Sequence, residues 1–206
     1  MISETRVLPN RFRRALLYVV EALGEVGVTK LQKILYLADL EHFLENGTTL
    51  TGARWVRYTH GPMAKALLPS ERAMDQHEIA VSIENTGPYE SRVFRPGPRP
   101  RFRPDLSREE RDVLDRVVGL TRDLTARESI RLAYNTAPMR LLLRLEEEAG
   151  QILLDRELTF ELSDELLADI ATSPSVADPA ERAAFKGREL ARIADLQSAV
   201  LSRAHP

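Results

Sequence analysis

The hydrophobic residues near the start of the chain recur at the three- and four-residue spacing of amphipathic helices. One such stripe runs from Phe12 to Leu23, and Gly24 follows where a helix would end. A second stripe predicts a helix over residues 29–45, and Asn46-Gly47 supplies the positive-φ residue that commonly closes a helix. These two patterns predict a helical N-terminal part.

Residues that cap helix N-termini mark further helices. A Ser or Thr followed three positions later by Glu or Gln has the spacing of a capping box, in which the two residues exchange side-chain-to-backbone hydrogen bonds. Three pairs fit this spacing: Thr29 with Gln32, Ser107 with Glu110, and Thr125 with Glu128. The last two predict helices over 107–124 and 125–135, and Thr136-Ala137-Pro138 predicts another that ends at Gly150.

Strand patterns lie between the N-terminal and central helices. Residues 55–59 have the β-branched and aromatic content of a short strand, and Gly61-Pro62 is interpreted as the first turn of a helix over 61–68. Alternating apolar residues over 79–84 predict a β-hairpin that continues to Arg95. We expect these strands to form one antiparallel sheet. The predicted fold class is α+β and mainly α: a helical domain with a small antiparallel sheet or hairpin inserted between the N-terminal and central helices.

The sequence changes character after residue 155. A short amphipathic helix is followed by a predicted final helix from Asp178-Pro179 to about Arg203. The apolar stripe of this last helix requires a cover, which is either the body of the protein or a partner. We therefore divide the chain into a helical domain with an inserted β-hairpin, residues 1–155, and a C-terminal helical extension, residues 156–206.

Composition and charge narrow the class of protein. The chain has 206 residues, is 43% hydrophobic and has a net charge of −2, which gives no overall attraction to nucleic acid or to an anionic membrane. The absence of cysteine excludes disulfides and thiolate zinc sites. The apolar run Ala15–Val20 is too short to span a bilayer. We expect a cytoplasmic protein that does not associate with membranes.

Candidate catalytic and metal-binding groups are sparse. Asp39 and His42 lie three positions apart on the predicted second helix, but no convincing third ligand accompanies them. His60 has no serine, cysteine or paired carboxylate that the sequence places beside it. The acidic run 146–148 at a helix end is interpreted as a solvated charged face. We predict no enzymatic activity, no cofactor and no metal site.

The segment from Arg92 to Arg103 is strongly basic. It contains five arginines and no acidic residue, and its prolines favour an extended backbone that projects side chains outward. One interpretation is a contact loop for an acidic protein surface or a phosphate-bearing ligand. The other is a solvated connector between the hairpin and the next helix.

A DNA-binding regulator is the alternative function. The predicted helices over 107–124 and 125–135 have almost no linker between them, as in a helix-turn-helix, and Arg127 and Arg131 would then reach a DNA groove. Glu128 lies on the same short helix, however, and DNA-binding modules obtain most of their affinity from phosphate-neutralising cations. Nucleic acid is therefore not the expected partner.

The order of several motifs resembles a known family. Residues 29–39 read Thr-Lys-Leu-Gln-Lys-Ile-Leu-Tyr-Leu-Ala-Asp, and residues 55–63 read Trp-Val-Arg-Tyr-Thr-His-Gly-Pro-Met. Ser107-Arg-Glu-Glu and Asn135-Thr-Ala-Pro occupy the later positions. In order and separation these motifs resemble the Panacea-domain family, the antitoxin fold of the SocA-like proteins, over about residues 12–154.

The resemblance implies an antitoxin that suppresses a cognate protein toxin by direct binding. The SocA-like branch is associated with delivery of its toxin to a protease, so occlusion of the toxin and adaptor-type delivery are both open. The sequence does not predict an oligomeric state. We expect the basic segment, the sheet face near Trp55 and the last helix to recognise the partner. The residues predicted to bind it are Trp55, Tyr58, Arg95, Arg99, Arg101 and Phe102.

Overall fold

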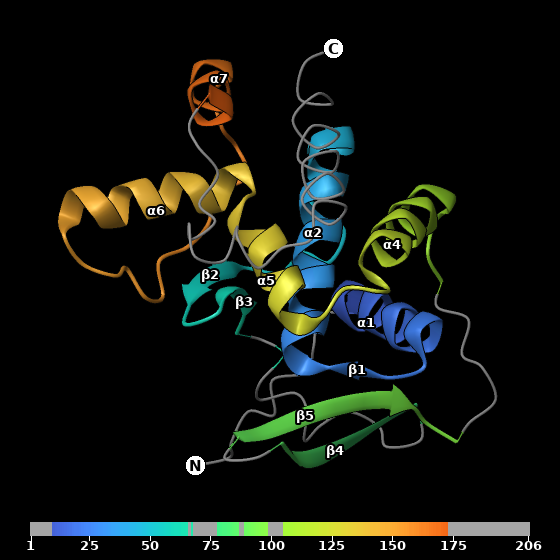
Figure 1. Ribbon diagram of the computed structural model, residues 1–206. Helices are drawn as coiled ribbons and strands as arrows, with labels where there is room; N and C mark the ends of the chain where they lie inside the picture. Colours follow the sequence, from blue (N-terminus) through green and yellow to red (C-terminus); the bar gives the residue numbers. More distant parts are fainter. Residues whose placement is uncertain (1–9, 66, 68–77, 87–88, 99–104, 173–206) are drawn as a thin grey trace, which may run out of the picture.

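Helix α2 (Val28–Asn46) runs through the middle of the protein, with helices on either side of it and the larger sheet below (Figure 1). The computed structural model describes residues 10–65, 67, 78–86, 89–98 and 105–172. The elements in chain order are α1 (Asn10–Leu23), β1 (Val26–Gly27), α2 (Val28–Asn46), β2 (Trp55–Tyr58), β3 (Gly61–Ala64), β4 (Ile79–Thr86), β5 (Tyr89–Pro96), α4 (Arg108–Thr121), α5 (Ala126–Tyr134), α6 (Ala137–Ala149) and α7 (Asp164–Thr172). This architecture confirms the predicted α+β, mainly α fold class.

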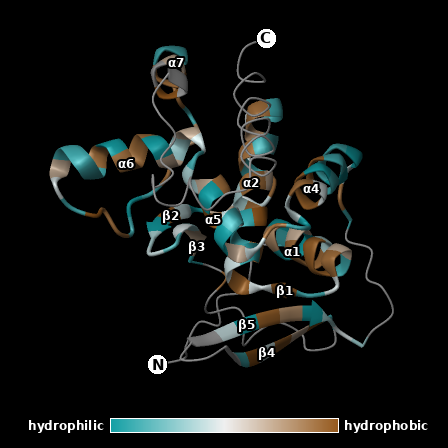
Figure 2. Ribbon diagram, viewed as in Figure 1, coloured by the Kyte–Doolittle hydropathy of each residue, from teal (hydrophilic) through white to brown (hydrophobic). Residues whose placement is uncertain are grey.

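Helix α2 is surrounded by other elements, which explains its mixed composition. Helices α1, α4 and α5 contact it, and so do strands β1, β3 and β5. Figure 2 shows apolar and polar residues mixed along α2, whereas α4 is apolar on one side and polar on the other. A helix that packs around most of its circumference does not show a single apolar stripe.

Leu35, in the middle of α2, tests how much this helix contributes to the core. Its side chain is fully buried among the residues of the main hydrophobic cluster. Leu35→Ala should lower the free energy of unfolding by about 2–5 kcal/mol, because it removes buried apolar surface and leaves a cavity. Chemical denaturation measures this change. Leu154→Ala, at an exposed position, is the control and should change stability by less than about 0.5 kcal/mol. A denaturation midpoint equal to that of the wild type would place Leu35 outside the core.

Local capping places the starts of α4 and α5 as predicted. The Ser107 hydroxyl accepts from the Glu110 N–H at 3.1 Å, and the Glu110 carboxylate accepts from the Ser107 N–H at 2.8 Å. Thr125 and Glu128 make the same reciprocal pair. The capping box predicted for Thr29 and Gln32 is wrong: α2 begins at Val28, its N-cap Gly27 has no side-chain cap, and Gln32 bonds to β3 instead.

The strands form two sheets and not the single sheet that the sequence predicts. β1, β5 and β4 form an antiparallel sheet in that order, with Val26 opposite Phe94. β2 and β3 form a separate hairpin, with Trp55 opposite Ala64. The predicted pairing of residues 55–59 with the later hairpin is wrong, because the two-residue strand β1 occupies that edge of β5. A strand this short has no periodicity that sequence analysis detects.

Gly61-Pro62 begins strand β3, so the helix predicted over 61–68 is wrong for residues 61–64. The φ of Gly61 is +86°, which favours glycine at this turn. Pro62 lies opposite Arg57, whose backbone N–H and C=O both bond to residues 155–156 on the other side. Arg57 and Pro62 are therefore a non-hydrogen-bonded pair, and the missing N–H of Pro62 removes no bond from the ladder.

Residues 151–163 lead from α6 to α7 and pass along the second side of β2. Val56 and Glu157 form an antiparallel bridge, and Leu158 belongs to the core cluster. Helix α7 confirms the short helix that the sequence predicts after this segment. The predicted final helix lies outside the described residues. The division of the chain into two units stays a prediction.

Candidate functional site

Polar side chains of α2 are buried and each is tied to another part of the chain. They are Gln32, Lys33, Tyr36, Asp39 and His42. Buried polar groups require hydrogen-bond partners because they lose their contacts with water. The Tyr36 hydroxyl, for example, lies 2.7 Å from the Thr136 hydroxyl at the start of α6. Most of these residues belong to the 29–39 motif, so the motif connects α2 to the elements around it.

Gln32 and Lys33 close the outer edge of β3. The Gln32 side-chain amide donates to the Ala64 carbonyl at 3.5 Å and accepts from the Ala64 N–H at 3.0 Å, as a neighbouring strand would. The Lys33 amine donates to the Pro62 carbonyl at 2.7 Å. These side chains satisfy backbone groups that β3 directs away from β2, and an unsatisfied buried backbone group would be costly.

The charge of Lys33 is disfavoured by its surroundings. Burial lowers the pKa of Lys33 to about 7, and the Arg57 guanidinium lowers it further in the same direction. A neutral amine still carries N–H groups, so the bond to Pro62 does not depend on protonation. Lys33 therefore loses most of its charge just above neutral pH while it continues to close the edge of β3.

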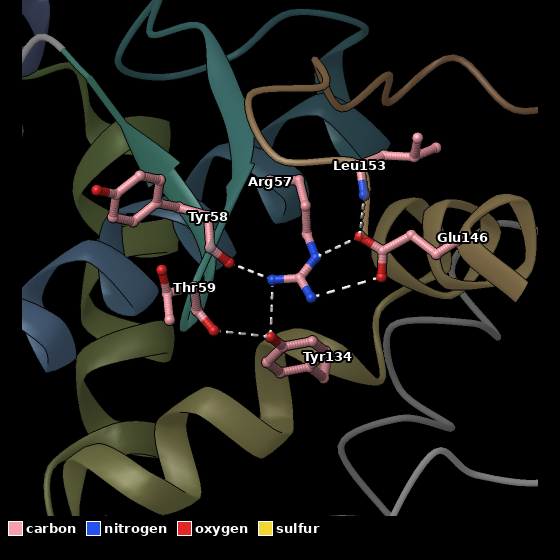
Figure 3. A network of polar contacts seen from close by, with 6 residues as sticks. All are labelled: Arg57, Tyr58, Thr59, Tyr134, Glu146 and Leu153. Atoms are coloured by element: carbon pink, nitrogen blue, oxygen red, sulfur yellow. Dashed lines mark hydrogen bonds and ion pairs between the residues drawn. The ribbon is translucent and has the colours of Figure 1, made fainter. Parts of the chain in front are cut away.

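Arg57 on β2 is the centre of a polar network that reaches α5 and α6 (Figure 3). Its guanidinium donates to the two carboxylate oxygens of Glu146 at 2.9 and 3.4 Å. It also donates to the Tyr134 hydroxyl at 2.9 Å and to the Tyr58 carbonyl. The guanidinium carbon lies 5.3 Å from the centroid of the Tyr134 ring. This buried, bidentate and charge-assisted pair belongs to the strongest class of hydrogen bonds in proteins. We call Arg57, Tyr134 and Glu146 the Arg57 network.

Glu146 also holds the segment that follows α6. Its carboxylate accepts from the Leu153 N–H at 3.0 Å. The interpretation of residues 146–148 as a solvated face is wrong for Glu146, which is buried, whereas Glu147 and Glu148 are exposed. Glu146 is buried because the Arg57 guanidinium pairs with its carboxylate. Arg57 is 89 positions away in the sequence and does not reach the other two glutamates.

Asp39 joins α2 to the segment before β2. It accepts hydrogen bonds from the Thr51 N–H at 2.6 Å, from the Thr51 hydroxyl and from Trp55 Nε1 at 2.7 Å. Burial raises the pKa of Asp39, and these donors act in the opposite direction. His42 Nδ1 lies 2.5 Å from the Thr48 carbonyl oxygen. Both side chains have structural partners, and the described residues contain no group of three His, Cys, Asp or Glu side chains arranged to hold a metal ion.

Aromatic rings lead from β2 along α2 to a surface groove. The ring centroid of Tyr36 lies 5.5 Å from that of Trp55 and 5.7 Å from that of Phe160, and Phe160 lies 5.8 Å from Phe43, all in edge-on geometry. Trp55, Phe43 and Phe160 also line the groove, which has a volume of about 820 Å³ and is bordered by residues 155–161. Exposed charged residues complete its lining.

The structure separates the residues predicted to bind a partner. Trp55 is 2% exposed and lines the groove, and its predicted contact with a partner stays a prediction. Tyr58 is 42% exposed, and its ring points away from the Arg57 network (Figure 3). Arg95 lies on β5, where it forms ion pairs with two carboxylates of the protein itself. The other predicted residues lie outside the described part of the chain: Arg99, Arg101 and Phe102. No contact of Tyr58 or Arg95 with a partner is tested, and both stay predictions.

The two helices interpreted as a helix-turn-helix are present, but their presence does not show that they bind DNA. α4 and α5 are joined by a short turn, and α5 packs against α2 and β3. Arg127 and Arg131, the predicted DNA contacts, both have interaction partners within the structure. Glu128 is used in the N-terminal capping box of α5. DNA binding stays a prediction.

The roles of Lys33, Gln32 and Glu146 were not apparent from the sequence. One signal was present for α2: its apolar residues at 31, 34, 35, 37 and 40 are spread over more than half of the helix circumference, which indicates a helix with neighbours on several sides and buried positions for the polar residues among them. Glu146 has no such signal, because its neighbours in the sequence are also glutamates and only the tertiary contact distinguishes it.

Comparison with known proteins gives one match. The family model described as "Antitoxin SocA-like, Panacea domain" matches residues 31–138, which is more than half of the chain. The matched region contains most of α2, strands β2 to β5, helices α4 and α5, and the start of α6. No curated protein and no solved structure matches the chain in the corresponding comparisons. None of the helices described here is long and apolar enough to cross a membrane.

Proposed function

This chain belongs to the antitoxin SocA-like, Panacea-domain family, and we propose that it is a cytoplasmic antitoxin that neutralises a cognate protein toxin by direct binding. The family match over residues 31–138 carries the proposal. The buried motif supports it, because its polar side chains are hydrogen-bonded to other parts of the chain. The motif therefore builds the scaffold, and recognition of a partner is left to the surface.

We place Tyr58 in the surface that contacts the toxin. Its backbone is held by β3 on one side, and its carbonyl accepts from Arg57. Tyr58 directly follows Arg57 in the sequence, and its ring is exposed and points away from the Arg57 network. A tyrosine on a rigid strand provides a large amphipathic contact area at a low cost in conformational entropy, and tyrosine is enriched at binding hot spots. Arg99, Arg101 and Phe102 remain proposed contacts on the basic segment.

Co-expression tests the proposed function. The product of the adjacent open reading frame should arrest growth when it is expressed alone, and co-expression of this chain should restore growth. The two proteins should also purify together. If the adjacent product is harmless, or if it arrests growth equally in the presence of this chain, the protein is not its antitoxin.

Tyr58→Ala should weaken toxin binding by about tenfold or more, because it removes a hot-spot contact. The melting temperature should change little, since the ring is largely outside the core. Titration calorimetry with the co-purified toxin measures the affinity. Ile83→Ala, at an exposed apolar position on β4, is the matched control and should bind like the wild type. Equal affinity of Tyr58→Ala and the wild type would remove Tyr58 from the interface.

Two modes of neutralisation remain to be distinguished. Occlusion of the toxin leaves its cellular level unchanged, whereas delivery to a protease lowers it. After synthesis of new protein is stopped, the toxin level is followed in the presence and absence of this chain. A faster loss of toxin that disappears in protease-deficient cells would identify delivery, and an unchanged rate of loss would identify occlusion.

A further inference from the structure

The small sheet around β2 has one edge that side chains of α2 close and one that no backbone group of the described residues closes. On the β3 edge, Gln32 and Lys33 bond to the outward-facing backbone groups. On the opposite side, residues 155–158 are joined to β2 by three backbone hydrogen bonds. A strand that is paired on one side presents its remaining N–H and C=O groups on the other side. Residues 155–158 therefore form the second edge of this sheet.

The hydrogen-bond pattern shows which groups of this edge face outward. The Leu158 N–H and the Arg156 carbonyl both bond to β2, at 2.9 and 2.8 Å. Successive residues of a strand direct their backbone groups to opposite sides, so the N–H and C=O of Glu157 point away from β2. No backbone hydrogen bond joins either group to another described residue. The edge thus offers a donor and an acceptor from a single residue, as a strand does to its neighbour.

Apolar side chains and the groove accompany this edge. Ile152 and Leu154, which immediately precede it, are 65% and 52% exposed. The groove lined by Trp55, Phe43 and Phe160 is bordered by the same segment. In β-augmentation, main-chain hydrogen bonds supply affinity and side-chain pockets supply selectivity. Here the open edge supplies the main-chain groups, and the aromatic groove and the exposed apolar residues supply the contacts for side chains.

The charges beside the edge are already balanced. Arg54 is paired with Glu157, and Lys65 is paired with Asp155 at 2.7 Å. The other charged residues lining the groove have opposite signs: Arg156 and Glu161. A charged side chain placed here would lose hydration without meeting an excess of the opposite charge. The charge distribution therefore complements an uncharged segment.

We propose that an extended, apolar and uncharged segment of the partner protein adds as a strand to the edge formed by residues 155–158 and places one side chain in the groove. This inference rests on the proposed function, since the partner is the toxin. A helix does not fit the edge equally well, because its own backbone N–H and C=O groups are bonded internally. The edge pairs with β2, the strand that carries Tyr58, so both surfaces are available to one partner.

A proline at position 157 tests the backbone contact directly. Glu157→Pro removes the outward-facing N–H but keeps the bonds that Arg156 and Leu158 make to β2. Glu157→Ala is the reference, because it also loses the carboxylate that pairs with Arg54 but retains the N–H. Binding to the toxin found by growth rescue should be about tenfold to a hundredfold weaker for Glu157→Pro than for Glu157→Ala, since a buried acceptor on the partner strand loses its donor. Melting temperatures verify that both variants fold alike.

A second pair of variants keeps the test decisive if Glu157→Pro unfolds. Thr159→Pro removes the N–H two positions further along, which strand alternation directs to the same side as the Glu157 N–H, and is compared with Thr159→Ala, with the same expected loss of affinity. In parallel, amide exchange followed by NMR should show the Glu157 N–H exchanging rapidly in the free chain and protected in the complex. These two results together would support strand addition.

The results that would overturn strand addition differ from those that would overturn the antitoxin role. Equal toxin affinity for the proline and alanine variants would overturn strand addition while the antitoxin role stands. Protection of the Glu157 amide in the free monomer would show that the chain itself occupies the edge. Loss of a homodimer in light scattering with unchanged toxin affinity would assign the edge to a second copy. If the wild-type chain neither rescues growth nor binds the adjacent product, the proposed function fails and this inference fails with it.

Discussion

Glu146→Leu should lower the free energy of unfolding by about 3–5 kcal/mol, because it leaves the Arg57 guanidinium buried without its counter-ion. Both side chains of the pair are almost completely inaccessible to solvent. Leucine fills much of the space of the glutamate, so the expected effect comes from the unpaired charge and not from a cavity. The substitution also removes the acceptor for the Leu153 N–H. Urea denaturation at constant pH measures the change.

Two comparisons isolate the charge effect of Glu146. Glu147→Leu changes the next residue of the same helix, which is exposed, and should alter stability by no more than about 0.5 kcal/mol. The double variant Arg57→Met with Glu146→Leu should recover much of the lost stability, because replacing both ions by apolar residues of similar volume is often neutral. A double variant as unstable as the sum of the two single variants would show that the ion pair is not the cause.

Lys33→Met should abolish a pronounced rise of stability with pH. The pKa of Lys33 is lowered by burial from 10.5 to about 7 in the folded protein. Between these values the unfolded chain binds a proton that the folded chain does not bind, so stability increases with pH. The full penalty is present below pH 7 and disappears above the unfolded pKa. From pH 7 to pH 9.5, the wild type should gain about 3 kcal/mol from this group.

Between pH 7 and pH 9.5, the change of stability with pH can be assigned to Lys33. Burial raises the pKa of Tyr134, so that tyrosine titrates at a higher pH than the range of the measurement. Lys33→Met loses the bond to the Pro62 carbonyl, which costs about 1–3 kcal/mol, but it removes a larger penalty. Near pH 7 the variant should therefore be more stable than the wild type.

Denaturation curves at several pH values provide the test of Lys33. Lys65→Met is the control, because Lys65 is a half-exposed lysine that directly follows β3, and this variant should retain the wild-type rise. If Lys33→Met shows the same increase between pH 7 and pH 9.5 as the wild type, then Lys33 is not the group responsible for it.

The features that the sequence predicted correctly depend on neighbours within a few positions. Ser107 and Thr125 begin helices because each exchanges hydrogen bonds with a glutamate three residues later. Gly47 and Gly150 end helices with φ values of +69° and +62°, which glycine adopts without strain. The β4–β5 hairpin likewise follows from alternating residues on two adjacent strands. In each case the interacting groups are close in the sequence, so the pattern alone identifies them.

The errors have a common origin in competition between local and distant partners. Thr29 and Gln32 have the spacing of a capping box, but Gln32 bonds to Ala64 instead. Residues 55–59 were expected to pair with the later hairpin, but β1 occupies that edge of β5 and β2 pairs with β3. The sequence of a short segment does not reveal which distant group will reach it, and tertiary packing overrides local preference.

The candidate site was therefore predicted in part. Tyr58 was proposed as a contact because an aromatic residue on a short strand is a recognisable signal; its ring is exposed, and its contact with a partner stays a prediction. The open edge over residues 155–158 was not identified, because it exists only through pairing with β2 about a hundred positions earlier. Nothing in the sequence of Asp155 to Leu158 distinguishes a strand that is paired on one side from a loop.

By itself the sequence determined the family, the mainly helical fold class and the ends of several helices, because motif order and local hydrogen bonding within a few residues are sufficient for these. The tertiary structure alone decided which edge of the small sheet is closed by Lys33 and Gln32, which glutamate of the acidic run is buried by Arg57, and which surface is left open. These outcomes depend on contacts between residues roughly 30 to 100 positions apart, and the free energy of burying a charge or a backbone group is set by the partner that folding brings to it.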